Sequence, residues 1–244
     1  MLSMNKRPVT TNNNESEIKK QKLEHPGFDL RLRHPSNFLF CGPSSSGKTT
    51  LALEIIKNKR FLFNVVPKHV ILIYSHPQKV YQDMYALGVI THMIDGYENF
   101  EQLKEMVMSY KYDGQSILVF DDQLSSLNDD ILRIFHELSH HGSCSVMFLS
   151  QNLFFANRKF RSISLNAHYI FVLKQVRDSS QIINLAKQYS PYRPNYVIEA
   201  YRQATRSSFS YLLFDFRNDS PDIIRLRTKI LPREHPPIVF IENS

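Results

Sequence analysis

Short apolar runs alternate with amphipathic stretches from residue 37 onward. Each run is four to six residues long and rich in Val, Ile, Leu or Phe, a pattern typical of strands that are buried on both faces. These runs predict core strands over residues 38–41, 70–74, 117–120, 145–150 and 169–173.

The stretches between the runs carry helical periodicity. The clearest is residues 128–141, where Ile131, Leu132, Phe135 and Leu138 form one apolar stripe and Asn128 can cap the first turn. Further helices are predicted over residues 51–58, 178–189 and 195–203, and an alternating strand over 209–216. Strands that alternate with helices predict an α/β fold, with a mostly parallel sheet covered by helices on both faces.

The ends of the chain differ from this pattern. Residues 1–24 are polar and have little to bury, so we expect a disordered basic tail. We assign residues 25–216 to one domain and the Pro-containing residues 217–244 to a peripheral C-terminal extension. The basic residues Lys6, Arg7, Lys19, Lys20 and Lys22 of the tail are spaced like a bipartite nuclear localisation signal, or form a plain solvated tail.

Composition narrows the class of protein. The formal net charge of +7 suits a protein that meets a polyanion, although such a surplus is common elsewhere. Cys41 and Cys144 both lie in or beside apolar runs, which indicates reduced thiols and an intracellular protein. No run approaches the roughly 20 apolar residues of a membrane span, so we expect no membrane partner.

The strongest motif follows the first predicted strand. Residues 42–49 read GPSSSGKT and match the phosphate-binding loop pattern completely, with a strand before them and a helix after them. Backbone N–H groups of such a loop surround phosphate oxygens at a helix N-terminus. Lys48 is expected to reach the β- and γ-phosphates of ATP, and Thr49 to place its hydroxyl on Mg²⁺. The predicted nucleotide-binding residues are Gly42, Pro43, Ser44, Ser45, Ser46, Gly47, Lys48, Thr49 and Thr50.

Polar residues follow two later strands. Asp121 and Asp122 end the strand 117–120, in the form of a Walker B motif, and Gln151 follows the strand 145–150. We expect Asp121 to hold Mg²⁺, Asp122 to polarise the attacking water, and Gln151 to sense the γ-phosphate. An additional strand between the P-loop strand and the Walker B strand marks hydrolysing NTPases, and residues 70–74 and 89–94 leave room for it. The acids and Gln151 should lie on neighbouring strands.

One rival motif lies on the helix 128–141. His136, Glu137 and His140 match the H-E-x-x-H pattern of zinc peptidases. No third ligand follows at the metzincin spacing, and the same helix is needed between two core strands. Histidines near a helix C-terminus also interact favourably with the helix dipole.

The P-loop, the paired acids and Gln151 follow one another in the chain. With this order of motifs the sequence resembles the FtsK/HerA superfamily, specifically the small DNA-packaging ATPases of poxviruses, Polinton-like elements, adintoviruses and virophages. The resemblance spans residues 37–189 and is most specific over 157–171, NRKFRSISLNAHYIF. It implies a RecA-like core with an additional strand, and a homomeric ring at a capsid or portal vertex that uses Mg-ATP to push double-stranded DNA into a preformed capsid. It also implies that the protein is located at an intracellular assembly site, in a host nucleus or in the virion.

The resemblance also implies an arginine that reaches the γ-phosphate of a neighbouring subunit. Arg161 is the first candidate and Arg158 the second, with Arg177 a weaker third; a phosphate-backbone contact or a solvated surface are the alternatives for these side chains. Lys174, Arg177, Arg193 and Arg202 are candidate contacts to DNA phosphates.

Other P-loop activities remain open. A nucleotide kinase should offer an acceptor pocket and an arginine-bearing lid, which the sequence does not reveal. A helicase should carry further motifs along a second motor domain, for which 244 residues leave no room. A regulatory switch, or a scaffold that binds ATP without turnover, would share the P-loop alone.

Overall fold

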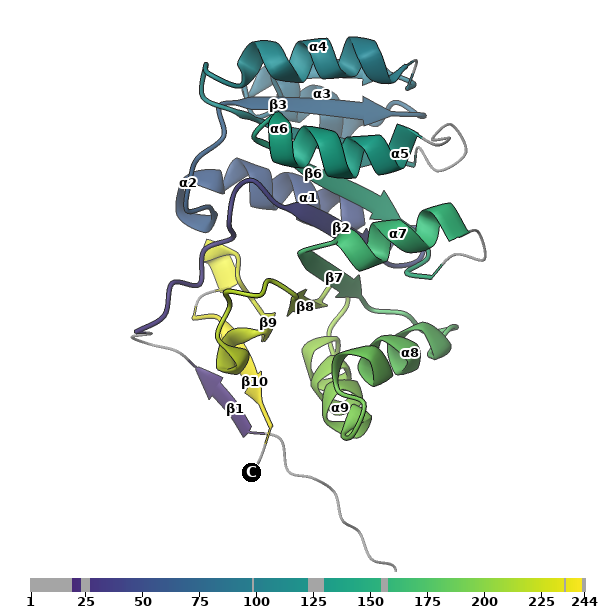
Figure 1. Cartoon of the computed structure of the whole chain (residues 1–244). Helices are drawn as coiled ribbons and strands as arrows, with labels where there is room; N and C mark the ends of the chain where they lie inside the picture. Colours follow the sequence, from purple (N-terminus) through teal and green to yellow (C-terminus); the bar gives the residue numbers. More distant parts are fainter. Residues whose placement is uncertain are drawn as a thin grey trace, which may run out of the picture.

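The computed structural model describes residues 19–22, 27–97, 99–122, 130–154, 158–234 and 236–242. Their strands form one ten-stranded sheet in the order β1-β10-β9-β8-β7-β2-β6-β5-β3-β4. In Figure 1 the sheet runs from β3 at the top of the view to β10 and β1 at the bottom. The sheet therefore includes both the first and the last strand of the described chain, β1 and β10.

Six strands, from β7 to β4 in that order, are parallel. Their bounds are β2 (Asn37–Cys41), β3 (His69–Tyr74), β4 (His92–Asp95), β5 (Ser116–Asp121), β6 (Cys144–Ser150) and β7 (Tyr169–Leu173). All residues of β2, β5, β6 and β7 are buried. The five strands predicted from apolar runs are thus confirmed to within one residue at each end.

Strand order identifies the fold. The strand that carries the P-loop, β2, lies between β7 and β6, and β6 separates it from the Walker B strand β5. The additional strand is therefore β6, whereas β3 and β4, which had seemed to leave room for it, lie beyond β5. The acids and Gln151 follow neighbouring strands, as expected. The chain has an α/β P-loop NTPase fold with a RecA-like, additional-strand core.

Helices cover both faces of the sheet (Figure 1). One face packs against α1 (Lys48–Lys57), α2 (Lys59–Leu62) and α3 (Lys79–Ala86). The other face packs against α4 (Phe100–Tyr110), α7 (Arg158–Asn166), α8 (Ser180–Tyr189), α9 (Pro194–Ala204) and the helical segment after residue 130. Each face is an apolar cluster, because the side chains of a buried strand alternate between the two faces.

The helix predicted over residues 128–141 is not uniform. It consists of α5 (Asp130–Arg133), a π-helical turn η1 (Ile134–Leu138) and α6 (Ser139–His141), and residues 128–129 lie outside the described chain. Ile134, Phe135 and Leu138 remain buried. Of the predicted apolar stripe, Phe135 and Leu138 are buried, and the side chains of Ile131 and Leu132 lie outside the described part of the structure.

The antiparallel part of the sheet corrects the predicted domain organisation. β8 (Tyr211–Asp215) is followed by η2 (Asp222–Ile224), β9 (Leu226–Thr228), η3 (Pro232–Glu234) and β10 (Ile238–Ile241). β9 and β10 continue the sheet, so residues 217–242 are part of the domain and not a peripheral appendage. Arg227 on β9 donates to Asp215 Oδ2 on β8 at 2.8 Å, with side chains 1% and 2% exposed. Removing one partner of such a pair typically costs about 3–5 kcal/mol.

The predicted disordered tail is wrong for four of its residues. β1 (Lys19–Lys22) pairs antiparallel with β10, with Lys19 opposite Ile241 and Lys22 opposite Ile238. The rest of the predicted tail, with Lys6 and Arg7, lies outside the described residues. The polar side chains of this segment offer little apolar surface to bury. Backbone hydrogen bonds to β10 instead offset the conformational entropy that the segment loses on becoming ordered.

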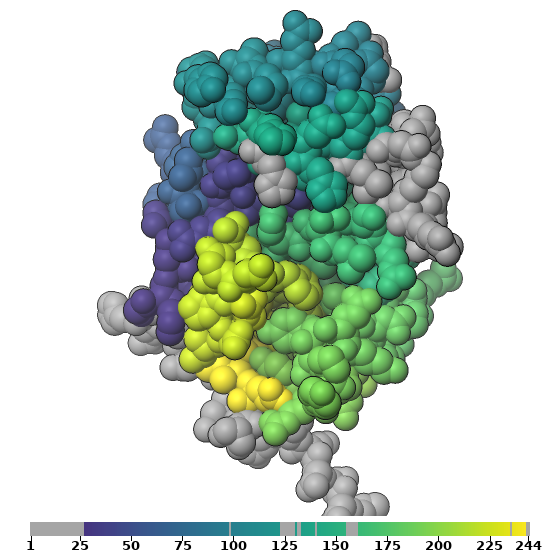
Figure 2. All heavy atoms as spheres, viewed as in Figure 1, coloured from purple at the N-terminus to yellow at the C-terminus, as the bar shows by residue number. Residues whose placement is uncertain are grey.

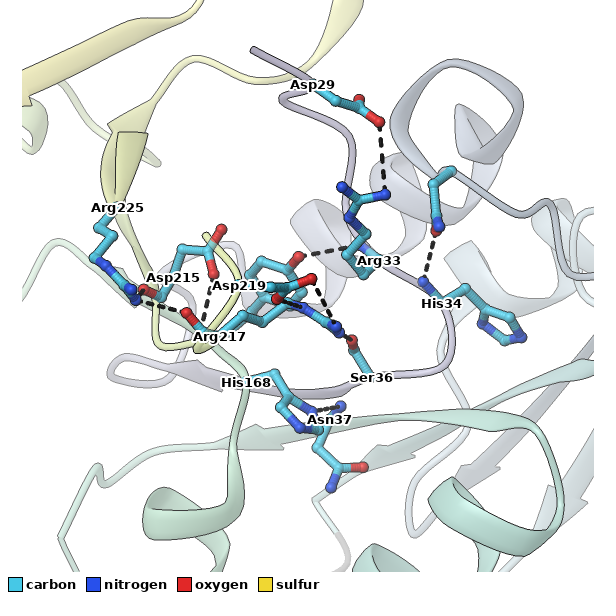
Figure 3. Close-up of polar contacts among 12 residues, drawn as sticks. Asp29, Arg33, His34, Ser36, Asn37, His168, Asp215, Arg217, Asp219 and Arg225 are labelled. Atoms are coloured by element: carbon cyan, nitrogen blue, oxygen red, sulfur yellow. Dashed lines mark hydrogen bonds and ion pairs between the residues drawn. The ribbon is translucent and has the colours of Figure 1, made fainter. Parts of the chain in front are cut away.

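Polar contacts connect the ends of neighbouring strands at the sheet edge that lies opposite the P-loop (Figure 3). Arg217, just after β8, donates to Ser36 Oγ at 2.9 Å and to Asp219 Oδ1 at 2.8 Å. The N–H of Asn37 donates to His168 Nδ1 at 2.9 Å. These contacts tie the entry of β2 to β7 and β8, and so fix the strand that carries the P-loop from its far end.

A hollow of about 600 Å³ also lies at this edge, lined by Tyr189, Tyr196, Phe216, Arg225 and Glu242 among others. Figure 2 views the side on which the segment after β8 (yellow-green) faces α8 and α9 (green). The hollow is separate from the sheet edge where the P-loop lies.

Candidate active site

The carboxyl ends of β2, β5 and β6 meet at one edge of the sheet. Cys41 pairs with Ser150, and Asp121 with Leu149, so Gly42, Asp122 and Gln151 emerge side by side as these strands end. The N–H of Gly42 donates to Ser150 O at 3.2 Å and joins the P-loop directly to the end of β6. Sequence motifs that are far apart in the chain are thus brought to one place.

Glycine is required at two positions of the P-loop, for different reasons. A Cβ atom on Gly42 would lie 2.8 Å from Ser46 Oγ and 2.9 Å from Leu173 Cβ, which is too close for any side chain. Gly47 has a φ of 94°, in the left-handed region that favours glycine. Helix α1 begins directly after it, so the helix N-terminus points its free N–H groups into the loop.

The side chain of Lys48 folds back onto the P-loop. Its Nζ donates to Gly42 O at 2.7 Å and to Pro43 O at 2.9 Å. Burial lowers the pKa of Lys48, and the negative charge of Asp121 counters this shift. The ammonium therefore sits inside the loop, where phosphate oxygens would be stronger partners than the two carbonyls.

Thr49 and Asp121 are in direct contact. The Thr49 hydroxyl donates to Asp121 Oδ2 at 2.6 Å, joining the P-loop helix to the end of β5 across the intervening strand β6. Hydroxyl and carboxylate oxygens are the hard ligands that Mg²⁺ prefers. The pair fits a Mg²⁺ ion that is held by few protein groups and mainly by nucleotide phosphates and water.

Asp121 has a second hydrogen-bond partner that the motif search missed. The Tyr81 hydroxyl, from α3, donates to the same Oδ2 atom at 2.7 Å, and the Tyr81 side chain is 1% exposed. Burial and the negative charge of Asp121 raise the pKa of Tyr81, which keeps the phenol a hydrogen-bond donor. Tyrosine on an amphipathic helix reads as an ordinary core residue, so sequence gave no signal for this role.

Asp122 occupies a different environment from Asp121. Its φ is 56° and its side chain is exposed, while its carbonyl accepts a hydrogen bond from Ser75 Oγ at 2.8 Å. Asp is among the few residues that tolerate the left-handed region. The backbone turns here, so Asp121 stays buried in the sheet edge while the adjacent carboxylate faces solvent, where a water could be bound.

Gln151 begins the loop after β6 with an exposed side chain. The loop is held by Gln181 of α8, which accepts from the N–H of Leu153 at 2.6 Å and donates to Asp178 Oδ2 at 2.7 Å. Gln181 was not predicted, because a single amide on a helix carries no motif. Through this contact α8 fixes the path of the chain on which Gln151 lies.

A cavity of about 510 Å³ lies beside the P-loop. One wall is made by the loop and the first turn of α1, including Ser45, Gly47 and Lys48 through Leu51, and Gln78 adds to it. The opposite wall comes from Phe209, Tyr211, Leu231, Arg233 and Glu234. Much of that wall belongs to the segment predicted as an extension, and no motif marked it.

The two arginines predicted to act on a neighbouring subunit, Arg158 and Arg161, both lie on α7. Arg161 is exposed on the second turn of α7, the helix that leads from β6 to β7. Arg158 begins the same helix, but its side chain is outside the described part of the structure. Arg161 is not among the described residues that line the cavity beside the P-loop. The role of both residues in a neighbouring subunit stays a prediction.

The candidate DNA contacts do not form one surface. Lys174 Nζ donates to Arg206 O at 2.9 Å, and Arg177 is exposed just after β7 at the P-loop edge. Arg193 forms an ion pair with Glu242 at 3.2 Å, beyond β10 and at the opposite edge. Arg202 is exposed on α9, 3.9 Å from Glu199. The structure thus separates Arg193 from Lys174 and Arg177.

The rival zinc motif is only partly described, because the side chain of His140 lies outside the described part of the structure. Glu137 accepts from Lys104 at 3.1 Å and from Arg133 at 3.1 Å, and these hydrogen bonds lower the pKa of its carboxyl group. Within the described residues no group of three or more His, Cys, Asp or Glu side chains could hold a metal ion. Nor is any described helix both long and apolar enough to cross a bilayer.

Neither a protein-family model nor a curated protein sequence matches the chain. Solved structures that resemble it include the genome-packaging NTPase B204 from Sulfolobus turreted icosahedral virus 2, in complex with ATP-γS. That match has 13% identity and a TM-score of 0.47, and covers 76% of this chain and 94% of that chain.

Two further solved structures are also similar. The flagellar accessory protein FlaH from Methanocaldococcus jannaschii has 14% identity and a TM-score of 0.38, over 57% of this chain and 71% of that chain. The N-terminal domain of zonular occludens toxin from Neisseria meningitidis has 12% identity and a TM-score of 0.34, over 60% and 80%.

Proposed function

We propose that this chain is an ATP hydrolase, and that it uses Mg-ATP to move double-stranded DNA into a viral capsid. The observation that carries the hydrolase proposal is the 2.6 Å contact between Thr49 and Asp121, made across β6. It brings a P-loop hydroxyl and a strand-end carboxylate to one point, next to the loop that would hold phosphates.

The residues have separate roles in this proposal. The P-loop amides and Lys48 bind the β- and γ-phosphates and compensate the charge that develops during transfer. Thr49 and Asp121 would hold Mg²⁺, which would neutralise phosphate charge when bound. Asp122 faces solvent and orients the attacking water, and Gln151 emerges beside it to sense the γ-phosphate.

Packaging as the use of this hydrolysis rests on the FtsK/HerA resemblance of the motif order and of residues 157–171. In that reading the chain forms a homomeric ring at a capsid or portal vertex, and Arg161 acts on the neighbouring subunit. The basic net charge of +7 suits contact with DNA phosphates. Localisation in a host nucleus stays a prediction, since Lys6 and Arg7 lie outside the described residues.

Among the other P-loop activities, a nucleotide kinase is distinguished by where the phosphoryl group goes, whereas a helicase-like enzyme and a regulatory switch also transfer it to water and are tested by the response of turnover to DNA. We would measure release of inorganic phosphate from ATP with and without Mg²⁺. Repeated Mg²⁺-dependent release to water is expected, with Lys48→Ala as the inactive control. Transfer to a nucleotide acceptor without net phosphate release would contradict the proposal, as would ATP binding without turnover in the assembled protein.

A further inference from the structure

Phe209 lies over the P-loop in an unusual conformation. Its φ is 58°, and the residue is 70% exposed. Its ring atom Cδ1 would lie 3.2 Å from a Cβ atom on Gly47, so the ring rests against the loop glycine. Bulky side chains rarely take a positive φ, and such strained positions gather at ligand sites. The aromatic surface therefore stands in water beside the phosphate loop.

Arg233 and Glu234 stand on the same side of the cavity, in η3. Arg233 is 65% exposed at its side chain and lies 3.7 Å from Glu54 of α1. Glu234 Oε2 accepts from Tyr211 Oη at 2.9 Å and from the N–H of Leu231 at 3.2 Å. These two bonds hold the Glu234 carboxylate in the wall, and its Oε1 atom has no partner among the described residues.

These groups match the chemistry of a nucleobase. A purine has flat faces that stack on aromatic rings and guanidinium planes. Its exocyclic amine donates hydrogen bonds, which a fixed carboxylate oxygen can accept. The cavity of about 510 Å³ continues from the loop that would hold phosphates to this wall, and pockets of about 300–1,000 Å³ typically hold ligands of such size.

We propose that Phe209, Arg233 and Glu234 form the nucleobase subsite for a purine nucleotide bound at the P-loop. Phe209 and Arg233 supply stacking surfaces, and Glu234 accepts a hydrogen bond from an exocyclic amine, as in adenine. The proposal rests on nucleotide binding at the P-loop. It assigns recognition of the base to residues in the range 209–234, whereas the phosphates of the same nucleotide would bind to the P-loop at residues 42–49.

The test separates the base from the phosphates. We would measure Kd by calorimetry for ATP and for tripolyphosphate, both with Mg²⁺. For Phe209→Ala we expect ATP to bind about tenfold more weakly, because stacking is lost, and tripolyphosphate to bind as it does to the parent chain. Phe209→Trp should restore ATP binding. Phe61→Ala is the matched control, because Phe61 is 72% exposed on α2 and away from the cavity.

Glu234→Gln tests the amine contact with inosine triphosphate, which carries an oxygen in place of the adenine amine. The parent chain should prefer ATP by about tenfold, and Glu234→Gln should reduce this preference, because a neutral amide is a weaker acceptor than a carboxylate. Equal binding of ATP and inosine triphosphate by the parent chain would overturn the role of Glu234.

The outcomes also distinguish this subsite from nucleotide binding itself. Unchanged ATP affinity in Phe209→Ala overturns the subsite and leaves the P-loop proposal standing. An equal loss of tripolyphosphate binding overturns it as well, since Phe209 would then act on the loop. If the parent chain binds neither ATP nor tripolyphosphate, the proposed function and the subsite both fail.

Discussion

The Tyr81 hydroxyl and the Thr49 hydroxyl donate to the same oxygen atom, Oδ2 of Asp121, at 2.7 Å and 2.6 Å. Tyr81 comes from α3 and Thr49 from α1, so two helices on one face of the sheet hold the Walker B carboxylate from two sides. These two hydrogen bonds fix the orientation of the carboxylate. Such preorganisation of a metal ligand is commonly required for tight binding of the ion.

Replacing Tyr81 by Phe removes one of these bonds and little else. We expect the Mg²⁺ concentration for half-maximal ATP turnover to rise by about tenfold, as happens when partners of metal ligands are removed. Turnover at saturating Mg²⁺ should fall less.

The control is Tyr85→Phe, because Tyr85 lies one turn further along α3 and is 53% exposed. An unchanged Mg²⁺ dependence of Tyr81→Phe would show that Tyr81 only packs in the core. A merely structural role would lower the free energy of unfolding without moving the Mg²⁺ requirement.

Lys48→Ala should abolish turnover, with kcat reduced by about 10²–10³-fold, because a charge that faces the transferring phosphoryl group is lost. Single-turnover hydrolysis of ATP measures this. Lys57→Ala, at the other end of α1, is the control, since Lys57 is exposed and lies away from the loop. Comparable loss in both variants would indicate a general effect on folding.

Asp122→Asn should preserve ATP binding and stop hydrolysis, by about 10²–10⁴-fold in kcat, if Asp122 polarises the attacking water. Asp121→Asn should instead raise the Mg²⁺ concentration needed for half-maximal turnover. Parallel measurement of Kd for ATP and of kcat separates the two acids. If Asp122→Asn turns over ATP at the parent rate, the attacking water is activated elsewhere.

Arg161→Ala should remove only the turnover that depends on assembly. An arginine supplied in trans is typically worth about 10³–10⁵-fold in kcat. Mixing Arg161→Ala with Lys48→Ala subunits should restore part of the turnover, because the intact Arg161 of one variant serves the intact P-loop of the other. Unchanged activity of the assembled Arg161→Ala protein would assign the role to another residue.

His34 predicts how stability depends on pH. It is 6% exposed, its Nδ1 lies 2.6 Å from Ser145 Oγ, and burial lowers its pKa to about 4. The unfolded chain, with an ordinary histidine pKa, binds more protons in the window between about 6.5 and 4, so stability is lost as pH falls through it.

From pH 7.5 to pH 5 this histidine should lower the free energy of unfolding by about 2 kcal/mol. Urea unfolding measures the change, and His34→Gln should flatten the dependence, whereas the exposed His76→Gln should not. Equal slopes in the parent chain and His34→Gln would mean that other groups dominate the titration.

Local patterns predicted the parallel core because each strand there is a short, continuous apolar run that no solvated segment would carry. The P-loop and Asp121 were found because phosphate and metal chemistry requires particular residues at a fixed spacing. The contacts of Tyr81 with Asp121 and of Phe209 with Gly47 were not predicted, because they arise only when distant elements meet. β1 was missed for a related reason: its order comes from backbone pairing with β10, more than 200 residues later in the chain.

The most direct test of the central claim is steady-state ATP turnover with and without long double-stranded DNA, measured on protein whose oligomer mass is determined in the same buffer. The account predicts a ring whose Mg²⁺-dependent turnover rises when DNA is added. A monomer that hydrolyses ATP at the same rate with and without DNA would contradict the translocating motor and favour a kinase or a regulatory switch.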